Sequence, residues 1–110
     1  MVVLGGVMNV DQTDAYPFLL RERDFLQAAV AADVPLLCIC LGGQLLARSL
    51  GARVPRARAP ETRFFPLHPT EEARTDPLFS CFRDGDRMFQ WHEDAIELPA
   101  GAGLLLRGTA

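Results

Sequence analysis

The sequence predicts an α/β domain with a mostly parallel central sheet. Three patterns support this prediction: an apolar run of strand length at the start, an amphipathic helical pattern over residues 18–32, and a second apolar run, Leu36–Ile39, followed by the helix formers of Gln44–Leu50. Strand, helix, strand and helix in this order are typical of βαβ units, whose strands pair in parallel. A second strand without polar residues favours a sheet that is covered on both faces.

The first strand and the first helix can be read directly from the residues. Met1–Leu4 is apolar and runs into Gly5 and Gly6, a pair that could simply form a tight turn. Pro17 stands where the first turn of a helix tolerates proline. In Phe18–Ala32, apolar side chains recur on one side and charged ones on the other, which is typical of a helix covering a sheet face.

The second half of the chain carries shorter patterns. The predicted strands are Ala52–Val54, Glu61–Leu67, Arg87–His92 and one beginning at Leu104–Leu106. Pro55–Pro60 is predicted to be a linker, and Glu71–Phe82 a short helix or two turns.

Composition and charge exclude several classes of protein. The chain has 110 residues, of which 49% are hydrophobic, and this suits a single globular core. The net charge of −3 and the lack of a basic run argue against nucleic acid or an anionic membrane as a partner. The longest apolar run, Val34–Gly43, is far shorter than the roughly 20 residues of a membrane span. Three cysteines without regular spacing predict no disulfide framework, so a reducing, cytoplasmic setting is the default expectation.

Cys40 stands at the point where the second strand turns into a helix. Gly42 and Gly43 follow, and glycine allows a sharp turn without a Cβ clash. Such a turn lifts the side chain above the sheet edge, as in a nucleophile elbow. It also places the sulfur at a helix N-terminus, where the helix dipole favours thiolate over thiol. Cys40 is therefore predicted to be a nucleophile.

Three segments carry a resemblance to a known family. Cys40–Gln44, with the sequence Cys-Leu-Gly-Gly-Gln, resembles the Cys-x-Gly-x-Gln signature of class I, triad-type glutamine amidotransferases. Leu4–Gly6 and Phe89–Asp94 resemble two further landmarks of that family, in the right order. The Trp-His-x-Asp region resembles that of stand-alone, GMP-synthase-like members. The resemblance implies a flavodoxin-like three-layer α/β sandwich.

The resemblance also implies an activity. It implies hydrolysis of the glutamine side-chain amide through a cysteine thioester, with the ammonia supplied to a synthetase partner and without a cofactor. The backbone amides of Gly6 and Leu41 are implied to form the oxyanion hole, and Gln44 and His92 to contact bound glutamine. From the residues alone, Gln44 could equally be a buried structural amide, and His92 a strand-end histidine packed beside Trp91.

Two other features of the sequence are not assigned to the site. The cysteines and histidines fit no standard zinc spacing, so no metal is predicted. His68–Thr70 resembles the family's catalytic His-Pro-Glu motif only in part, because threonine replaces glutamate and the run precedes the Trp-His landmark. His68 is therefore expected to be a loop histidine.

Two parts of the family's domain have no counterpart in this sequence: the βαβ unit before the Gly-Gly strand, and the histidine and glutamate after the Trp-His region. We therefore interpret residues 1–110 as the central part of one class I glutamine amidotransferase-like domain, truncated at both ends, and expect poor glutamine hydrolysis by the chain alone. Two other functions stay open. They are a γ-glutamyl hydrolase of the same superfamily and a non-catalytic regulatory or interaction module.

Overall fold

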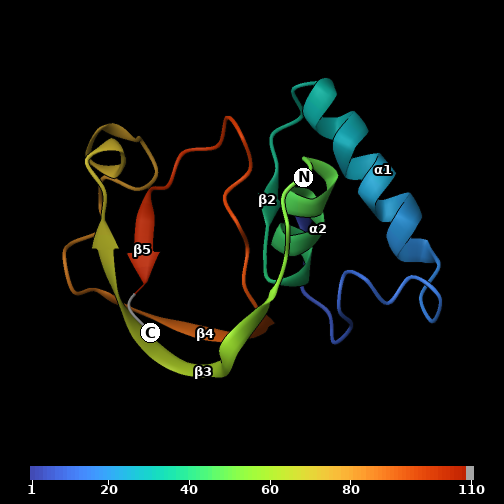
Figure 1. Ribbon diagram of the computed structural model, residues 1–110. Helices are drawn as coiled ribbons and strands as arrows, with labels where there is room; N and C mark the ends of the chain where they lie inside the picture. The colour runs from blue at the N-terminus through green and yellow to red at the C-terminus, as the bar shows by residue number, and fades with distance from the viewer. Residues whose placement is uncertain (109–110) are drawn as a thin grey trace. The chain divides into compact units, whose positions relative to one another are not determined.

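In the computed structural model, which describes residues 1–108, the chain forms two compact units. The first unit holds residues 1–57 and 94–100, and the second holds residues 58–93 and the chain from residue 101 on. Both units contain strands, and the two α-helices belong to the first unit (Figure 1). The predicted α/β class is confirmed.

The sheet of the first unit is a parallel pair. Strand β1 (Val2–Val3) pairs with β2 (Leu37–Cys38), with Val2 opposite Leu37 and Val3 opposite Cys38. Backbone bonds of 2.9 Å extend the pairing at both ends, from the amide of Leu37 to the carbonyl of Met1 and from the amide of Ile39 to the carbonyl of Val3. The two predicted strands and their parallel pairing are confirmed, although each strand is short.

Two helices accompany this pair of strands. Helix α1 spans Phe18–Ala31 with Pro17 before its first turn, as predicted, and α2 spans Leu41–Ser49, beginning three residues earlier than predicted. Helix α2 packs against both α1 and β2 (Figure 1). Gly51, at a φ of 84°, follows Leu50, the residue that caps the C-terminal end of this helix. No helix within residues 1–108 is long and apolar enough to cross a bilayer.

The core of the first unit lies between the two helices and the loop before α1. Its members are apolar side chains with exposed fractions of 5% or less: Val10, Leu19, Leu26, Leu41, Leu45, Ala47 and Val54. Full burial of one such leucine or valine contributes about 1.5–3 kcal/mol to the free energy of unfolding. This cluster fixes α2, and therefore the residue at its start, on the rest of the unit.

The second unit is built on a three-stranded sheet in the order β4-β3-β5. These strands span Arg56–Pro69 (β3), Arg87–Asp94 (β4) and Leu106–Gly108 (β5). A single 3-10 turn, η1 (Glu72–Thr75), follows β3. Thr70 links the end of β3 to the chain before β5, because its hydroxyl donates to the carbonyl of Leu104 at 2.7 Å.

One expectation is confirmed in part and two need correction in this half of the chain. The mostly parallel sheet is confirmed in part: β1 and β2 pair in parallel, whereas β3 and β5 pair antiparallel. Pro55–Pro60 is not a linker, because β3 begins at Arg56. Ala52–Val54 is not a strand, although the carbonyl of Arg53 accepts a bond of 3.0 Å from the amide of Glu97.

The contact between α2 and β1 leads to a first prediction. A Cβ added at Gly42 would lie 2.7 Å from the carbonyl oxygen of Val3, which is backbone and cannot move aside, whereas a Cβ at Gly43 would meet the carbonyl oxygen of Cys38 at an ordinary 3.5 Å. We expect Gly42→Ala to lower the free energy of unfolding by about 2–3 kcal/mol. Gly43→Ala should raise it by about 0.5–1 kcal/mol, because alanine favours a helix. Urea unfolding of both variants measures this, and equal effects would contradict it.

Candidate active site

Cys40 occupies the position before the first residue of α2, in a backbone conformation that side chains rarely adopt. Its φ is 54° and its ψ is −116°. Asp33 is the one other non-glycine residue with positive φ within residues 1–108. Such a conformation costs about 1–3 kcal/mol and persists only where surrounding structure imposes it. The predicted sharp turn from strand to helix is present, and the side chain at the turn is exposed.

The first turn of α2 holds this conformation through backbone bonds. The amide of Gly42 donates to the carbonyl of Ile39 and the amide of Gln44 donates to the carbonyl of Cys40, both at 3.0 Å. Cys40 therefore lies at the N-terminal end of the helix, which is the positive end of its dipole. The first amides of any helix, here including that of Leu41, have no partner within the helix.

The glycine pair after β1 lies against this turn. A Cβ added at Gly5 would be 3.1 Å from the Cβ of Cys40 and 3.6 Å from its Sγ. A Cβ added at Gly6 would be 2.8 Å from Cδ2 of Leu41. The structure therefore brings the predicted nucleophile together with the two residues whose amides were predicted to bind an oxyanion. A side chain at Gly5 would require the neighbouring Cys40 to shift by a few tenths of an ångström.

Gln44 lies one helical turn after Cys40 and is 5% exposed. It is thus a buried polar residue within the first unit, close to the predicted nucleophile along the helix. Both alternatives from the sequence, a contact to bound glutamine and a structural amide, agree with this burial. The predicted binding role stays a prediction.

His92 belongs to strand β4 in the second unit. Its Nε2 lies 3.0 Å from Oε2 of Glu61 and 2.9 Å from Oε1 of Gln90. With 25% of its side chain exposed, His92 is held by polar groups on β3 and β4, and its neighbour Trp91 is 72% exposed. These contacts were not predicted from the sequence, and the role of His92 in binding glutamine stays a prediction.

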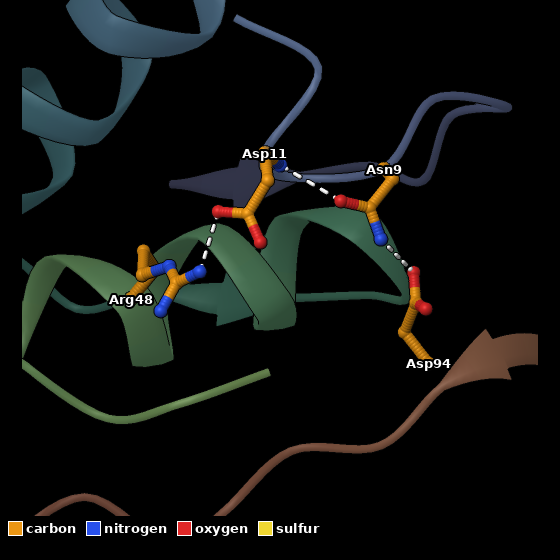
Figure 2. Close-up of polar contacts among 4 residues, drawn as sticks. All are labelled: Asn9, Asp11, Arg48 and Asp94. Carbon is orange, nitrogen blue, oxygen red and sulfur yellow. Dashed lines mark hydrogen bonds and ion pairs between the residues drawn. The ribbon is translucent and has the colours of Figure 1, made fainter. Parts of the chain in front are cut away.

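A chain of polar contacts in the first unit was also missed (Figure 2). Nδ2 of Asn9 donates to Oδ2 of Asp94 at 2.6 Å, and Oδ1 of Asn9 accepts from the amide of Asp11 at 2.8 Å. The carboxylate of Asp11 forms an ion pair with Arg48 on α2. Asn9 and Asp94 are 85 positions apart, so no local pattern could reveal their contact.

The other candidates of the sequence lie outside this arrangement. His68 forms a hydrogen bond of 2.7 Å with Asp84 in the second unit and, contrary to expectation, lies within strand β3. No group of three or more His, Cys, Asp or Glu side chains among residues 1–108 could hold a metal ion. Burial raises the pKa of the Cys38 thiol, against a smaller opposing effect of the positively charged N-terminus.

The chain resembles known proteins over nearly its whole length. Residues 1–106 match the family model "Glutamine amidotransferase class-I". The sequence is 31% identical to the glutamine amidotransferase-like protein YfeJ of Salmonella typhimurium and 28% identical to a glutamine-hydrolyzing GMP synthase chain of Thermococcus kodakarensis. Each match covers 96% of this chain, with 45% of the first relative and 52% of the second.

A solved structure agrees with these matches. The crystal structure of a glutamine amidotransferase from Thermotoga maritima superimposes with a TM-score of 0.84 at 33% identity, over 96% of this chain and 46% of the other. The present chain thus spans about half the length of the relatives that it matches.

The backbone at Cys40 leads to a second prediction. Alanine is usually more favourable than glycine by about 0.5–1 kcal/mol in regular structure. At a φ of 54° and a ψ of −116° the order should reverse, since glycine alone adopts this conformation without a Cβ clash. We expect Cys40→Gly to be more stable than Cys40→Ala by about 1 kcal/mol in urea unfolding. An Ala variant that is the more stable of the two would show that the turn is unstrained.

Cys38, at the end of β2, and Cys40, at the turn, should differ in their rates of alkylation. Cys38 is partly buried and its pKa is raised, so at pH 7 a smaller fraction of it is thiolate than in an ordinary cysteine. Cys40 is exposed. We expect iodoacetamide to alkylate Cys40 first at pH 7, and the rate at Cys38 to keep rising as the pH passes the ordinary cysteine pKa. Mass spectrometry of the modified peptides measures both rates, and faster alkylation of Cys38 at pH 7 would contradict the assignment.

Proposed function

Since the chain belongs to the class I glutamine amidotransferase family, we propose that Cys40 cleaves the side-chain amide of glutamine and that the ammonia serves a synthetase. The observation that carries this proposal is the position of Cys40 at a strained strand-to-helix turn, against Gly5 and beside Leu41. Amide cleavage by a thiol needs an exposed nucleophile and hydrogen-bond donors where negative charge develops.

The proposed reaction begins at the sulfur of Cys40. The thiolate attacks the side-chain carbonyl carbon of glutamine, and the electron pair of the C=O bond moves to the oxygen. The resulting tetrahedral oxyanion collapses, the nitrogen takes a proton from water, the C–N bond breaks, and ammonia leaves. Water then hydrolyses the thioester to glutamate and restores the thiol.

The amides of Gly6 and Leu41 are the proposed donors to this oxyanion. Leu41 contributes one of the first amides of α2, which point out of the helix end. Gly6 lies against the side chain of Leu41, so both residues border the same turn. Removing one such donor typically lowers kcat about 10²- to 10³-fold. Gln44 and His92 are the proposed contacts to the substrate.

A synthetase partner is proposed from similarity to one relative. The protein of Thermococcus kodakarensis is named as one of the subunits of a glutamine-hydrolyzing GMP synthase, and it is 28% identical to this chain. By analogy, we propose that ammonia made at Cys40 passes to a separate synthetase chain. Glutamine hydrolysis by the whole protein and its coupling to a synthetase are both parts of this proposal.

Site-selective labelling tests the function directly. The probe is the chloromethyl ketone analogue of glutamine, whose carbonyl resembles the one under attack. We expect it to modify Cys40 at least about tenfold faster than Cys81, which is exposed but lies in the second unit. L-Glutamine should slow the modification of Cys40, and D-glutamine should not. Cys81→Ser is the matched control, because it removes an exposed thiol and should leave the labelling of Cys40 unchanged.

Two results would contradict the proposal. Equal labelling of Cys38, Cys40 and Cys81, without protection by L-glutamine, would favour a non-catalytic module. Protection by γ-glutamyl peptides but not by L-glutamine would favour a γ-glutamyl hydrolase.

A further inference from the structure

We propose that Asn9 and Asp94 are positioning residues that hold the loop after Gly6 in place, so that its amide can meet the developing oxyanion. This inference rests on the proposed function, because it assigns these residues a role at the same site. Neither residue is proposed to touch the substrate. Their contact, drawn in Figure 2, lies wholly within the first unit.

Asn9 follows Gly6 by three residues and organises the loop between β1 and α1. Its backbone amide donates to Oε1 of Gln12 at 2.7 Å, and its carbonyl accepts from the amide of Gln12 at 3.1 Å. Its side-chain oxygen accepts from the amide of Asp11 at 2.8 Å. Both the backbone and the side chain of Asn9 are therefore engaged in the turn.

The remaining group of Asn9 anchors this turn to a distant part of the unit. Nδ2 donates to Oδ2 of Asp94 at 2.6 Å, and Asp94 is 8% exposed. A hydrogen bond to a buried carboxylate is charge-assisted, and such bonds are about twice as strong as neutral ones. Asp94 is itself held in place, since the next amide, that of Ala95, donates to the carbonyl of Pro55 at 2.8 Å.

The same loop is attached to α2 on its other side. Val10 is 4% exposed and belongs to the core cluster that contains Leu41 and Leu45. Asp11 forms its ion pair with Arg48, in the last turn of α2 (Figure 2). The loop is thus fixed between the helix that carries the nucleophile and the buried carboxylate of Asp94.

This attachment has a consequence for Gly6. An oxyanion donor must lie 2.7–3.1 Å from the oxygen that it stabilises, and a displacement of 1 Å can cost about 10²-fold in rate. Glycine has no side chain with which to hold itself in position. The placement of its amide depends on neighbouring residues. Met8 packs against the core cluster, and Asn9 is the nearest following residue whose side chain donates a hydrogen bond outside the loop.

The orientation of the Asn9 side chain permits a sharp test. Its oxygen faces an N–H group and its NH2 faces a carboxylate. Asn9→Asp would keep the first bond but set two carboxylates against each other. Asn9→Asp combined with Asp94→Asn would restore one donor and one acceptor, since the amide of the new side chain at 94 can donate to the carboxylate at 9.

The experiment measures two reactions of Cys40 in the full chain. With the chloromethyl ketone analogue of glutamine, the sulfur of Cys40 bonds to the methylene carbon and chloride leaves, and donors to the adjacent carbonyl oxygen assist this displacement. Iodoacetamide loses iodide in the same way, but it has no glutamine backbone to hold its carbonyl against those donors. For Asn9→Asp we expect the maximal rate with the ketone to fall about 10- to 100-fold. The rate with iodoacetamide and the ketone concentration for half-maximal rate should stay within about threefold of wild type. The double exchange should restore the ketone rate to within about threefold.

Glu97→Gln is the matched control. It changes an acid to its amide three positions from Asp94, at an exposed ion pair with Arg53, and should leave both rates unchanged. If Asn9→Asp does not fold, Asn9→Ala is measured in the same way, with the same expected loss of ketone rate. Thermal unfolding by circular dichroism establishes that each variant is folded.

Three outcomes decide the inference. A folded Asn9→Asp or Asn9→Ala variant with an unchanged ketone rate would overturn it, leaving Asn9 a purely structural residue. A double exchange that fails to recover the ketone rate, although it folds, would overturn the pairing with Asp94. A wild-type chain whose Cys40 shows no L-glutamine-protected labelling would instead remove the proposed function, and this inference with it.

Discussion

The close approach of α2 to the end of β1 is the constraint on which the candidate site depends. The Cα of Gly42 faces the carbonyl of Val3 so closely that a Cβ there would lie 2.7 Å from the oxygen. Helix α2 can therefore begin beside β1, with two residues between it and the end of β2, only if this position lacks a side chain. Two further results follow from the same approach: the exposed position of Cys40 at the turn and the contact of Gly5 with it.

The strain at Cys40 is maintained by the packing of the helix that follows the turn. A positive φ at a residue with a Cβ costs about 1–3 kcal/mol. Burial of Leu41 and Leu45, which are 5% and 1% exposed, contributes about 1.5–3 kcal/mol for each side chain. The burial of α2 thus exceeds the cost of the turn at its start. A relaxed turn would require the helix to shift, and the helix is held by its core residues.

The sequence predicts the first half of the fold well and the second half less well. The βαβ order of residues 1–50 follows from local periodicity, which is why β1, β2 and both helices can be found. In β3, prolines and arginines conceal the alternation of a strand, so that Pro55–Pro60 resembles a linker. The nucleophile can be predicted because the signature is contiguous. The bond between Asn9 and Asp94 cannot, because it joins two polar residues that have no periodic relation and lie 85 positions apart.

This difference arises because the proposed nucleophile is a side-chain atom, whereas one proposed oxyanion donor is a backbone amide. The sulfur comes from one contiguous run of sequence, Cys40–Gln44, and a contiguous run can be recognised without a structure. The proposed amide donor at Gly6 is backbone, which every residue but proline possesses, so its chemical identity says nothing about where it points. We infer that its direction is set by contacts that arise only when the chain folds, among them the hydrogen bond from Asn9 to the buried carboxylate of Asp94. A sequence with an intact cysteine signature but without such a contact could therefore retain the nucleophile and lose the alignment of its donor.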